Sequence, residues 1–253
     1  MSSVCCHTFA SGRVEIVLNR PERRNALDRE AAKDLDVAVS ASLGAPSVMV
    51  RGEGGSFCSG GDLADLHRLP VSDLQATMAQ IQEALEQLSA APGIVVAWVD
   101  GVALGGGLEL ALAADLIWMH PRARLRAAQL EMGLVPGWGG LERASQRLGE
   151  ARARALFLDP RWIDAKEAVA LGLADRVLED LSAARQEAER LAELARDAVA
   201  WVKQGGAFDA DLFSRLWEGP AHRQAVRRFM AGRPAHGGSA SPGHPEKGES
   251  DHA

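Results

Sequence analysis

The run Ile94 to Val99 (IVVAWV) constrains the fold more than any other segment of this chain. Six consecutive apolar residues are typical of a strand that is covered on both faces. The segment that follows, from Gly101 to Ala114, begins rich in glycine and then takes on helical spacing. Further strands are predicted at Arg13 to Leu18, Ser47 to Arg51 and Leu116 to Met119. Strand and helix alternate as far as about residue 176, which predicts an α/β layered fold.

The chain is predicted to have three parts. Residues 1–180 contain all the predicted strands, together with helices at Asp28 to Leu43 and Met78 to Leu88. Residues 181–231 are predicted to form a helical C-terminal module, with a long helix from Ala183 to Trp201 followed by helices at Phe208 to Trp217 and His222 to Met230. Residues 232–253 have almost no large apolar side chain, so burial cannot offset the entropy of ordering them. This tail is predicted to be disordered.

The composition of the chain argues against several classes of partner and cofactor. The net charge of −6 argues against nucleic acid, because phosphate binding needs a basic surface. No apolar run approaches the roughly 18 residues that span a bilayer, and the first residues lack the pattern of a secretory signal. Three cysteines make neither a disulfide framework nor a metal-ligand spacing. We therefore expect a cytoplasmic protein in a reducing setting, with no membrane partner, metal or redox cofactor.

Two glycine-rich loops each follow a predicted strand, at Ser56 to Leu63 and Asp100 to Leu110. Glycine is used where the backbone approaches another group closely or adopts unusual dihedral angles. Gly105 to Gly107 also begin a helix, where free N–H groups favour a negative oxygen. One amide from each loop can hold a single oxyanion; alternatively, both loops are ordinary turns and close-packed helix starts. Neither loop has the spacing of the dinucleotide-binding Gly-x-Gly-x-x-Gly fingerprint.

Four motifs in a fixed order carry a resemblance to a known family. They are Arg20-Pro21 with Arg24-Asn25-Ala26-Leu27, then Phe57 to Leu63, then Gly101 to Leu110, then Gly133-Leu134-Val135-Pro136-Gly137-Trp138-Gly139-Gly140. Residues 165–177 and 229–234 are also similar. From about residue 10 to residue 235 the chain resembles the crotonase (enoyl-CoA hydratase/isomerase) superfamily. The resemblance implies a crotonase-type spiral of ββα units, a C-terminal helical trimerisation module, and a homotrimer or a dimer of trimers.

The resemblance also implies a coenzyme A thioester as substrate, so that coenzyme A is part of the substrate and not a cofactor. Gly61 and Gly106 match the family's oxyanion hole, whose amides hold the thioester oxygen as it becomes an enolate. Arg24 and Ala26 fall where the family lines its CoA-binding groove, although Arg24 is also consistent with a solvated loop residue.

Glu109 lies three residues after Gly106, one helical turn on, so both can face the same side. It matches the first of two glutamates with which the family's hydratases activate water and protonate the α-carbon. Gln129 stands where the second glutamate is usual; it cannot exchange a proton usefully, and we expect it to contact substrate. Glu131 lies two residues further along the chain, and its side chain would point the same way as that of Gln129 if the segment is extended. Glu131 is then either a displaced acid or a surface residue.

The segment from Arg124 to Gly140 resembles the ethylmalonyl-CoA decarboxylase branch of the family, which keeps the equivalent of Glu109 and lacks the second glutamate. Decarboxylation needs only an oxyanion hole and one acid. A lyase that decarboxylates a short-chain malonyl-type CoA ester is therefore the favoured interpretation. The alternatives are an enoyl-CoA hydratase and a non-catalytic crotonase-fold scaffold protein, and an acyl-carrier-protein thioester is a further possible substrate.

Four more side chains near these motifs have less specific predictions. His67 is expected on a helix flanking the acyl pocket, where it either touches substrate or is a partly exposed helix residue. Trp138 is expected to pack against the acyl pocket or a neighbouring helix. Asp62 is expected to cap or orient its loop, and Cys58 to be inert packing.

Overall fold

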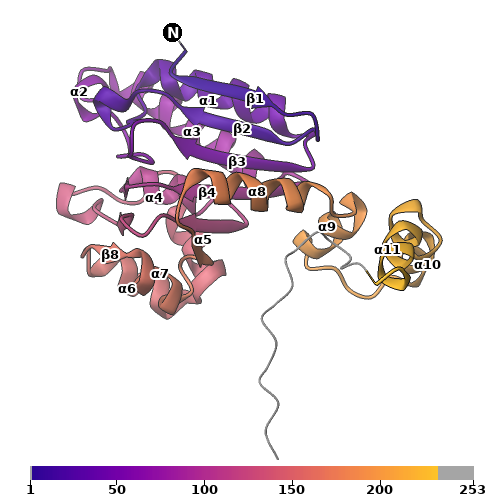
Figure 1. Cartoon of the computed structure of the whole chain (residues 1–253). Helices are drawn as coiled ribbons and strands as arrows, with labels where there is room; N and C mark the ends of the chain where they lie inside the picture. Colours follow the sequence, from indigo (N-terminus) through magenta and orange to yellow (C-terminus); the bar gives the residue numbers. More distant parts are fainter. Residues whose placement is uncertain (1, 233–253) are drawn as a thin grey trace, which may run out of the picture. The chain divides into compact units, whose positions relative to one another are not determined.

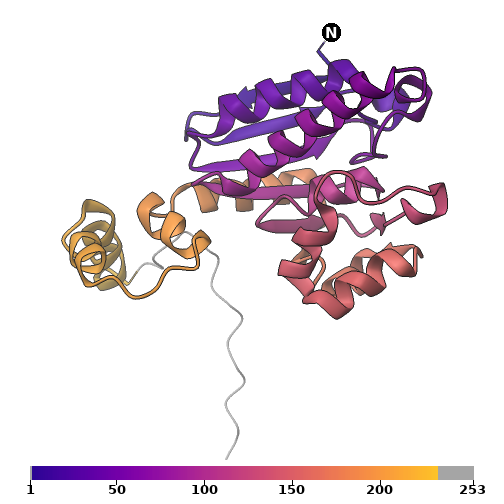
Figure 2. The same ribbon diagram turned by 180° about the vertical axis from the view of Figure 1, so that it is seen from behind.

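The computed structural model of this chain describes residues 2–232 and separates into two units, with the division after Gly206. Of the tail predicted to be disordered, all but Gly232 lies outside the described residues. Figure 1 labels the helices and some of the strands, and Figure 2 gives the view from behind.

The first unit is built on a six-stranded sheet in the order β1-β2-β3-β4-β6-β9. The first pair is antiparallel and the remaining pairs are parallel. A smaller sheet has the order β5-β7-β8. The strands are β1 (Val4–Thr8), β2 (Val14–Leu18), β3 (Ser47–Gly52), β4 (Ile94–Val99), β5 (Val102–Leu104), β6 (Leu116–Met119), β7 (Arg124–Arg126), β8 (Ile163–Asp164) and β9 (Arg176–Val177). All four strands predicted from the sequence are confirmed, and every residue of β4 is buried as its apolar run indicated.

Helices cover both faces of the large sheet. Helices α1 and α3 lie on one face of the sheet and α8 lies on the opposite face (Figures 1 and 2). The buried apolar side chains of α1 and α3 belong to one cluster, and those of α8 belong to another. The α1 helix begins where the Asp28 carboxylate accepts a hydrogen bond from the Ala31 amide at 2.8 Å. The helices of this unit are α1 (Arg29–Ser42), α2 (Leu63–Leu66), α3 (Val71–Ala90), α4 (Gly106–Ala111), α5 (Gly140–Leu148), α6 (Glu150–Leu158), α7 (Ala165–Leu171), α8 (Leu181–Ala192) and α9 (Arg196–Lys203), with 3₁₀ turns η1 (Pro21–Arg23) and η2 (Leu130–Met132). Among residues 2–232, no helix is both long and apolar enough to cross a membrane.

The predicted boundary at residue 181 is too early, because α8 belongs to the first unit. Its buried residues Ala184, Ala188 and Leu191 form one cluster with Met49 and Trp98 of the sheet. The predicted single helix from residue 183 to 201 is also wrong: it is broken between α8 and α9, where Ala195 takes extended dihedral angles. The amphipathic pattern continues across the break, which is why the sequence did not reveal it.

A buried ion-pair network fastens α8 to the sheet. The Glu15 side chain, 1% exposed, accepts hydrogen bonds from Arg13 at 3.0 Å, Arg51 at 3.2 Å and Arg185 of α8 at 2.8 Å. Burial by itself would raise the pKa of Glu15, but the hydrogen bonds from Arg185 and Arg13 and the Arg185 charge outweigh it and lower the pKa to about 2.

The second unit contains α10 (Ala210–Trp217) and α11 (Pro220–Met230). Neither helix buries a residue. Aromatic rings lie along this unit, with Phe213 stacked on Trp217 at 5.8 Å between centroids and Trp217 stacked on His222 at 4.4 Å. The predicted helices at 208–217 and 222–230 are confirmed, and large apolar side chains of this unit, Phe213, Trp217 and Phe229 among them, are more than half exposed.

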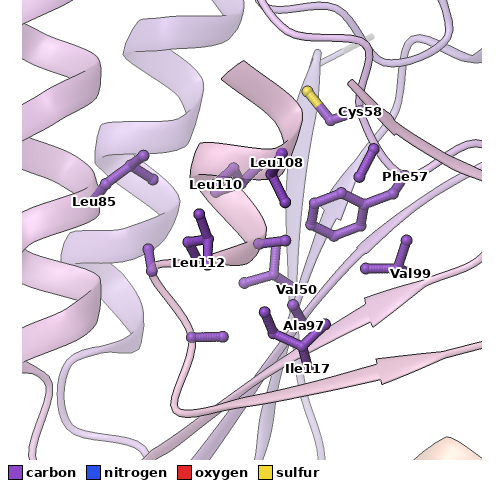
Figure 3. Close-up of a cluster of buried hydrophobic side chains, with 14 of the residues drawn as sticks. Val50, Phe57, Cys58, Leu85, Ala97, Val99, Leu108, Leu110, Leu112 and Ile117 are labelled. Atoms are coloured by element: carbon purple, nitrogen blue, oxygen red, sulfur yellow. The ribbon is translucent and has the colours of Figure 1, made fainter. Parts of the chain in front are cut away.

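The position of α4 within the first unit is fixed by its apolar side chains. Figure 3 shows Leu108 and Leu110 of α4 lying over Val50, Ala97 and Phe57. Leu108 is fully buried, and Leu110 is 1% exposed. This packing holds the glycine-rich turn before α4 against the strands, and it determines where Gly106 and Glu109 stand.

Candidate active site

The two glycine-rich loops lie side by side, which they must do if both are to contribute to one site. The Phe57 amide donates to the Val102 carbonyl at 3.0 Å, and the Leu104 amide donates to the Cys58 carbonyl at 3.0 Å. Gly60 has φ +92°, and a Cβ placed on it would lie 3.0 Å from the Gly106 nitrogen. Such closeness leaves no room for a side chain, so Gly60 is required both by its dihedral angle and by the contact.

Gly61 and Gly106 have amides that donate to no other described residue. The two glycines are brought near each other by the pairing of their loops and by Trp138, whose indole borders both. Two unpaired backbone donors on adjoining loops suit an oxyanion, because each would add a hydrogen bond to a developing negative oxygen. The sequence predicted this pairing of loops, and the structure contains it.

The Glu109 carboxylate accepts hydrogen bonds from three neighbouring groups. Its side chain is 2% exposed. One oxygen, Oε1, accepts from Gln129 Nε2 at 2.7 Å. The other, Oε2, accepts from the backbone amides of Trp138 and Gly140, each at 2.8 Å. A carboxylate has about four lone-pair sites, so one site on Oε1 is left for a further donor.

Gly140 was not singled out from the sequence, although it lies in the fourth motif. A Cβ placed on Gly140 would lie 2.3 Å from Glu109 Cγ and 2.9 Å from Oε2. Only glycine therefore allows the backbone to approach the carboxylate this closely. The Gly139-Gly140 pair at the start of α5 does indicate that the backbone lies close to another group. The sequence does not show that this group is the Glu109 carboxylate.

Gln129 is buried in the structure, whereas Glu131 is exposed. Gln129 is 8% exposed, and its Oε1 is buried without a hydrogen-bond partner among the described residues. Glu131, whose side chain is 45% exposed, forms an ion pair with Arg126, with Nη2 to Oε2 at 2.7 Å. The segment is a 3₁₀ turn and not extended, so a shift of two residues turns the side chain away. Of the two interpretations of Glu131, this geometry favours the surface residue.

The loop before the first glycine motif is held by Arg20 and Asn25, which the sequence did not assign a role. Arg20 Nη2 contacts Asp28 at 2.6 Å and Asp62 at 3.2 Å. The Asn25 amide, 1% exposed, donates to the Glu53 and Ser56 carbonyls at 2.9 and 2.8 Å. Asn25 also has φ +57°, a conformation that asparagine tolerates better than most residues.

The other predicted site residues are placed as follows. Arg24 is exposed with φ +50°, and Ala26 beside it is 6% exposed. His67 is exposed at the end of α2, which favours the interpretation as an exposed helix residue. Asp62 pairs with Arg20, in keeping with a role in orienting its loop. Cys58 is fully buried, and burial raises the pKa of its thiol to about 12, as expected for inert packing.

In this α/β fold two glycine-rich loops lie side by side, next to the buried and hydrogen-bonded carboxylate of Glu109. Residues 8–227 match the family model described as enoyl-CoA hydratase/isomerase. The chain belongs to this family and has the crotonase fold.

Relatives of known sequence and structure agree with this assignment. A Rhizobium meliloti protein named probable enoyl-CoA hydratase is 31% identical over 245 residues, covering 88% of this chain and 94% of that protein. The structure of an enoyl-CoA hydratase from Bacillus anthracis is similar with a TM-score of 0.82 and 25% identity, over 91% of this chain and 97% of that one. A Thermobifida fusca structure in complex with acetoacetyl-CoA has a TM-score of 0.73 and 28% identity, over 91% and 96%.

Proposed function

We propose that this protein adds water across the C2–C3 double bond of a 2-enoyl-CoA thioester. The observation that carries the proposal is Glu109, a buried carboxylate with one lone-pair site to spare, one helical turn from the unpaired Gly106 amide. The names of the relatives support hydration, which was the alternative interpretation of the sequence, over the favoured decarboxylation. The acetoacetyl-CoA complex of a similar structure supports a CoA thioester as the class of substrate.

The two loops supply the electrostatic part of the reaction. When water attacks C3, an electron pair moves through C2 to the thioester oxygen and makes an enolate. The Gly61 and Gly106 amides would donate to that oxygen as its charge grows. Removing one donor of this kind typically costs about 3–4 kcal/mol of transition-state stabilisation.

A single carboxylate can carry both proton transfers. Glu109 Oε1 would take a proton as the water oxygen bonds to C3, and it would return that proton to C2 as the enolate collapses. The unpartnered Gln129 Oε1 would accept the other hydrogen of the water and so hold it against Glu109. In this scheme Gln129 orients the nucleophile and exchanges no proton, and Glu131 takes no part.

Decarboxylation of a malonyl-type CoA ester remains a second candidate, because one specific observation favours it. Gln129 stands where a second carboxylate would be, so of these two positions Glu109 alone carries one. Loss of CO₂ leaves the same enolate in the same oxyanion hole, and Glu109 would protonate it. A non-catalytic scaffold is disfavoured by the unpaired amides and the fixed carboxylate.

The test is mass spectrometry of separate incubations with crotonyl-CoA, methylmalonyl-CoA and ethylmalonyl-CoA, in ordinary water and in ¹⁸O-labelled water. We expect crotonyl-CoA to gain one water, with the label incorporated at C3, and the malonyl-type esters to remain intact. Release of CO₂ without hydration of crotonyl-CoA would replace the proposal with the second candidate.

We further propose that the exposed aromatic face of α10 and α11 packs against other copies of this chain, in a trimer or a dimer of trimers. The support is that neither helix buries a residue, although Phe213 and Trp217 are large and more than half exposed. Sedimentation of the wild-type protein and of Phe213→Glu tests it. A wild-type monomer, or an assembly unchanged in the variant, would refute the proposal.

A further inference from the structure

We infer that Trp138 determines which acyl chains this protein accepts, and that it restricts them to short ones. The inference rests on the proposed function for its substrate class, a CoA thioester. It concerns the wall of the site beside the two oxyanion glycines and not the chemistry at Glu109.

The Trp138 indole fills the space next to both glycines. A Cβ placed on Gly106 would lie 2.3, 2.5 and 2.6 Å from three carbons of the ring. A Cβ placed on Gly61 would lie 4.0 Å from a fourth ring carbon and 2.7 Å from Leu66 Cδ1. Trp138 is 3% exposed and Leu66 is 6% exposed. The region beside the oxyanion hole is therefore occupied by packed side chains, and an acyl chain meets a wall there.

The indole is also held in place from several sides. Its Nε1–H donates to the Met78 sulfur of α3 at 3.4 Å. The Trp138 backbone amide donates to Glu109, and its carbonyl accepts a hydrogen bond from Arg143. Swinging the ring out would break the Met78 contact and expose an apolar surface that is now buried, so a long substrate cannot displace the ring without cost.

This placement has a direct consequence for the substrate. The thioester oxygen is to bind at Gly61 and Gly106 while C2 and C3 face Glu109, so the acyl group lies in the space that the indole borders. A hydrophobic pocket discriminates one methylene by roughly 10- to 200-fold, so a filled wall is enough to exclude medium and long chains.

The test compares wild type, Trp138→Phe and Trp138→Ala. Affinities for butyryl-CoA and octanoyl-CoA are measured by calorimetry, and kcat/KM is measured for the matching 2-enoyl-CoA esters. We expect wild type to prefer the short ester by about tenfold or more, Trp138→Phe to have a smaller preference, and Trp138→Ala to have lost or reversed it. A merely structural role would weaken all esters alike and leave their ratio unchanged.

Trp162→Ala is the matched control, because this indole contacts Arg124 and Arg126 and borders neither glycine. It should keep the wild-type ratio. The inference would be overturned by equal affinity of the wild type for both esters, or by a short-to-long ester ratio that is unchanged in both Trp138 variants. If Trp138→Ala does not fold, Trp138→Phe alone provides the test. Selective binding of the short ester without turnover of any ester would leave the inference standing and refute the proposed function.

Discussion

Replacing Glu109 by glutamine removes the group that we propose transfers protons, while changing the shape of the site very little. The glutamine oxygen can still accept from the Trp138 and Gly140 amides, which now donate to Oε2 at 2.8 Å. Its NH₂ group would then face Gln129, so the Gln129 amide must rotate and present its oxygen. That oxygen has no partner now, so the number of hydrogen bonds around residue 109 is unchanged.

The expected magnitudes differ sharply between activity and stability. General acid–base catalysis contributes roughly 10²–10⁴ in rate, so we expect kcat for crotonyl-CoA to fall by that factor in Glu109→Gln. The loss of charge-assisted hydrogen bonds should change the free energy of unfolding by about 1 kcal/mol, which is about 2–4 °C in Tm for a chain of this size. KM should change little.

The assay is steady-state hydration of crotonyl-CoA, with Tm measured on the same preparations. Glu131→Gln is the matched control, because it removes a carboxylate that is exposed and paired with Arg126. It should keep kcat within about twofold and lose no more than about 1 kcal/mol of stability. A Glu109→Gln enzyme that kept more than a tenth of wild-type kcat would refute the assignment of Glu109 as acid and base.

Three further outcomes follow from the geometry. Gly140→Ala should reduce kcat by about 10²-fold with KM retained, because its Cβ would lie 2.3 Å from Glu109 Cγ; near wild-type kinetics would refute the close approach. The pKa of Glu15 is lowered to about 2, so its contribution of at most about 3 kcal/mol is present above pH 4.5 and is lost as the pH falls toward 2. Urea unfolding of wild type and Glu15→Gln should therefore differ most near neutrality and converge in acid, and a constant difference would contradict the ion-pair network. The buried Cys58 thiol, with its pKa raised to about 12, should react with a thiol reagent only after unfolding, whereas the two N-terminal cysteines react in the native protein; rapid reaction of all three would be inconsistent with this packing.

The large sheet was predictable where strands are continuous apolar runs. Ile94–Val99 and Leu116–Met119 have the predicted bounds, because a strand buried on both faces needs an apolar residue at every position. β1 was missed because Val4–Thr8 (VCCHT) is an edge strand with mostly exposed side chains. The two-residue strands β8 and β9 are too short to leave a pattern.

The candidate site was predictable in its components more than in its contacts. The spacing of Gly106 and Glu109 on one helix predicted that they share a side. The prediction that the Glu131 side chain points the same way as that of Gln129 was wrong because it assumed an extended segment. In the structure this segment is a 3₁₀ turn that ends at Gly133, which has φ +67°. The donors to Glu109 could not be found from side-chain types, because two of the three are backbone amides, which every residue but proline possesses.

The loop at residues 138–140 holds Glu109 by its main chain and lines the site with the side chain of Trp138. The two tasks at position 138 are therefore separable. We expect that exchanging the indole for a smaller group widens the range of thioesters, while the amide that donates to Glu109 stays in place. Proline is the exception there, since it lacks the N–H, and position 140 allows no such exchange because only glycine fits. On the proposed roles of Trp138 and Glu109, substrate range is thus open to redesign at a residue whose amide holds the Glu109 carboxylate, without a change to the groups proposed for the chemistry.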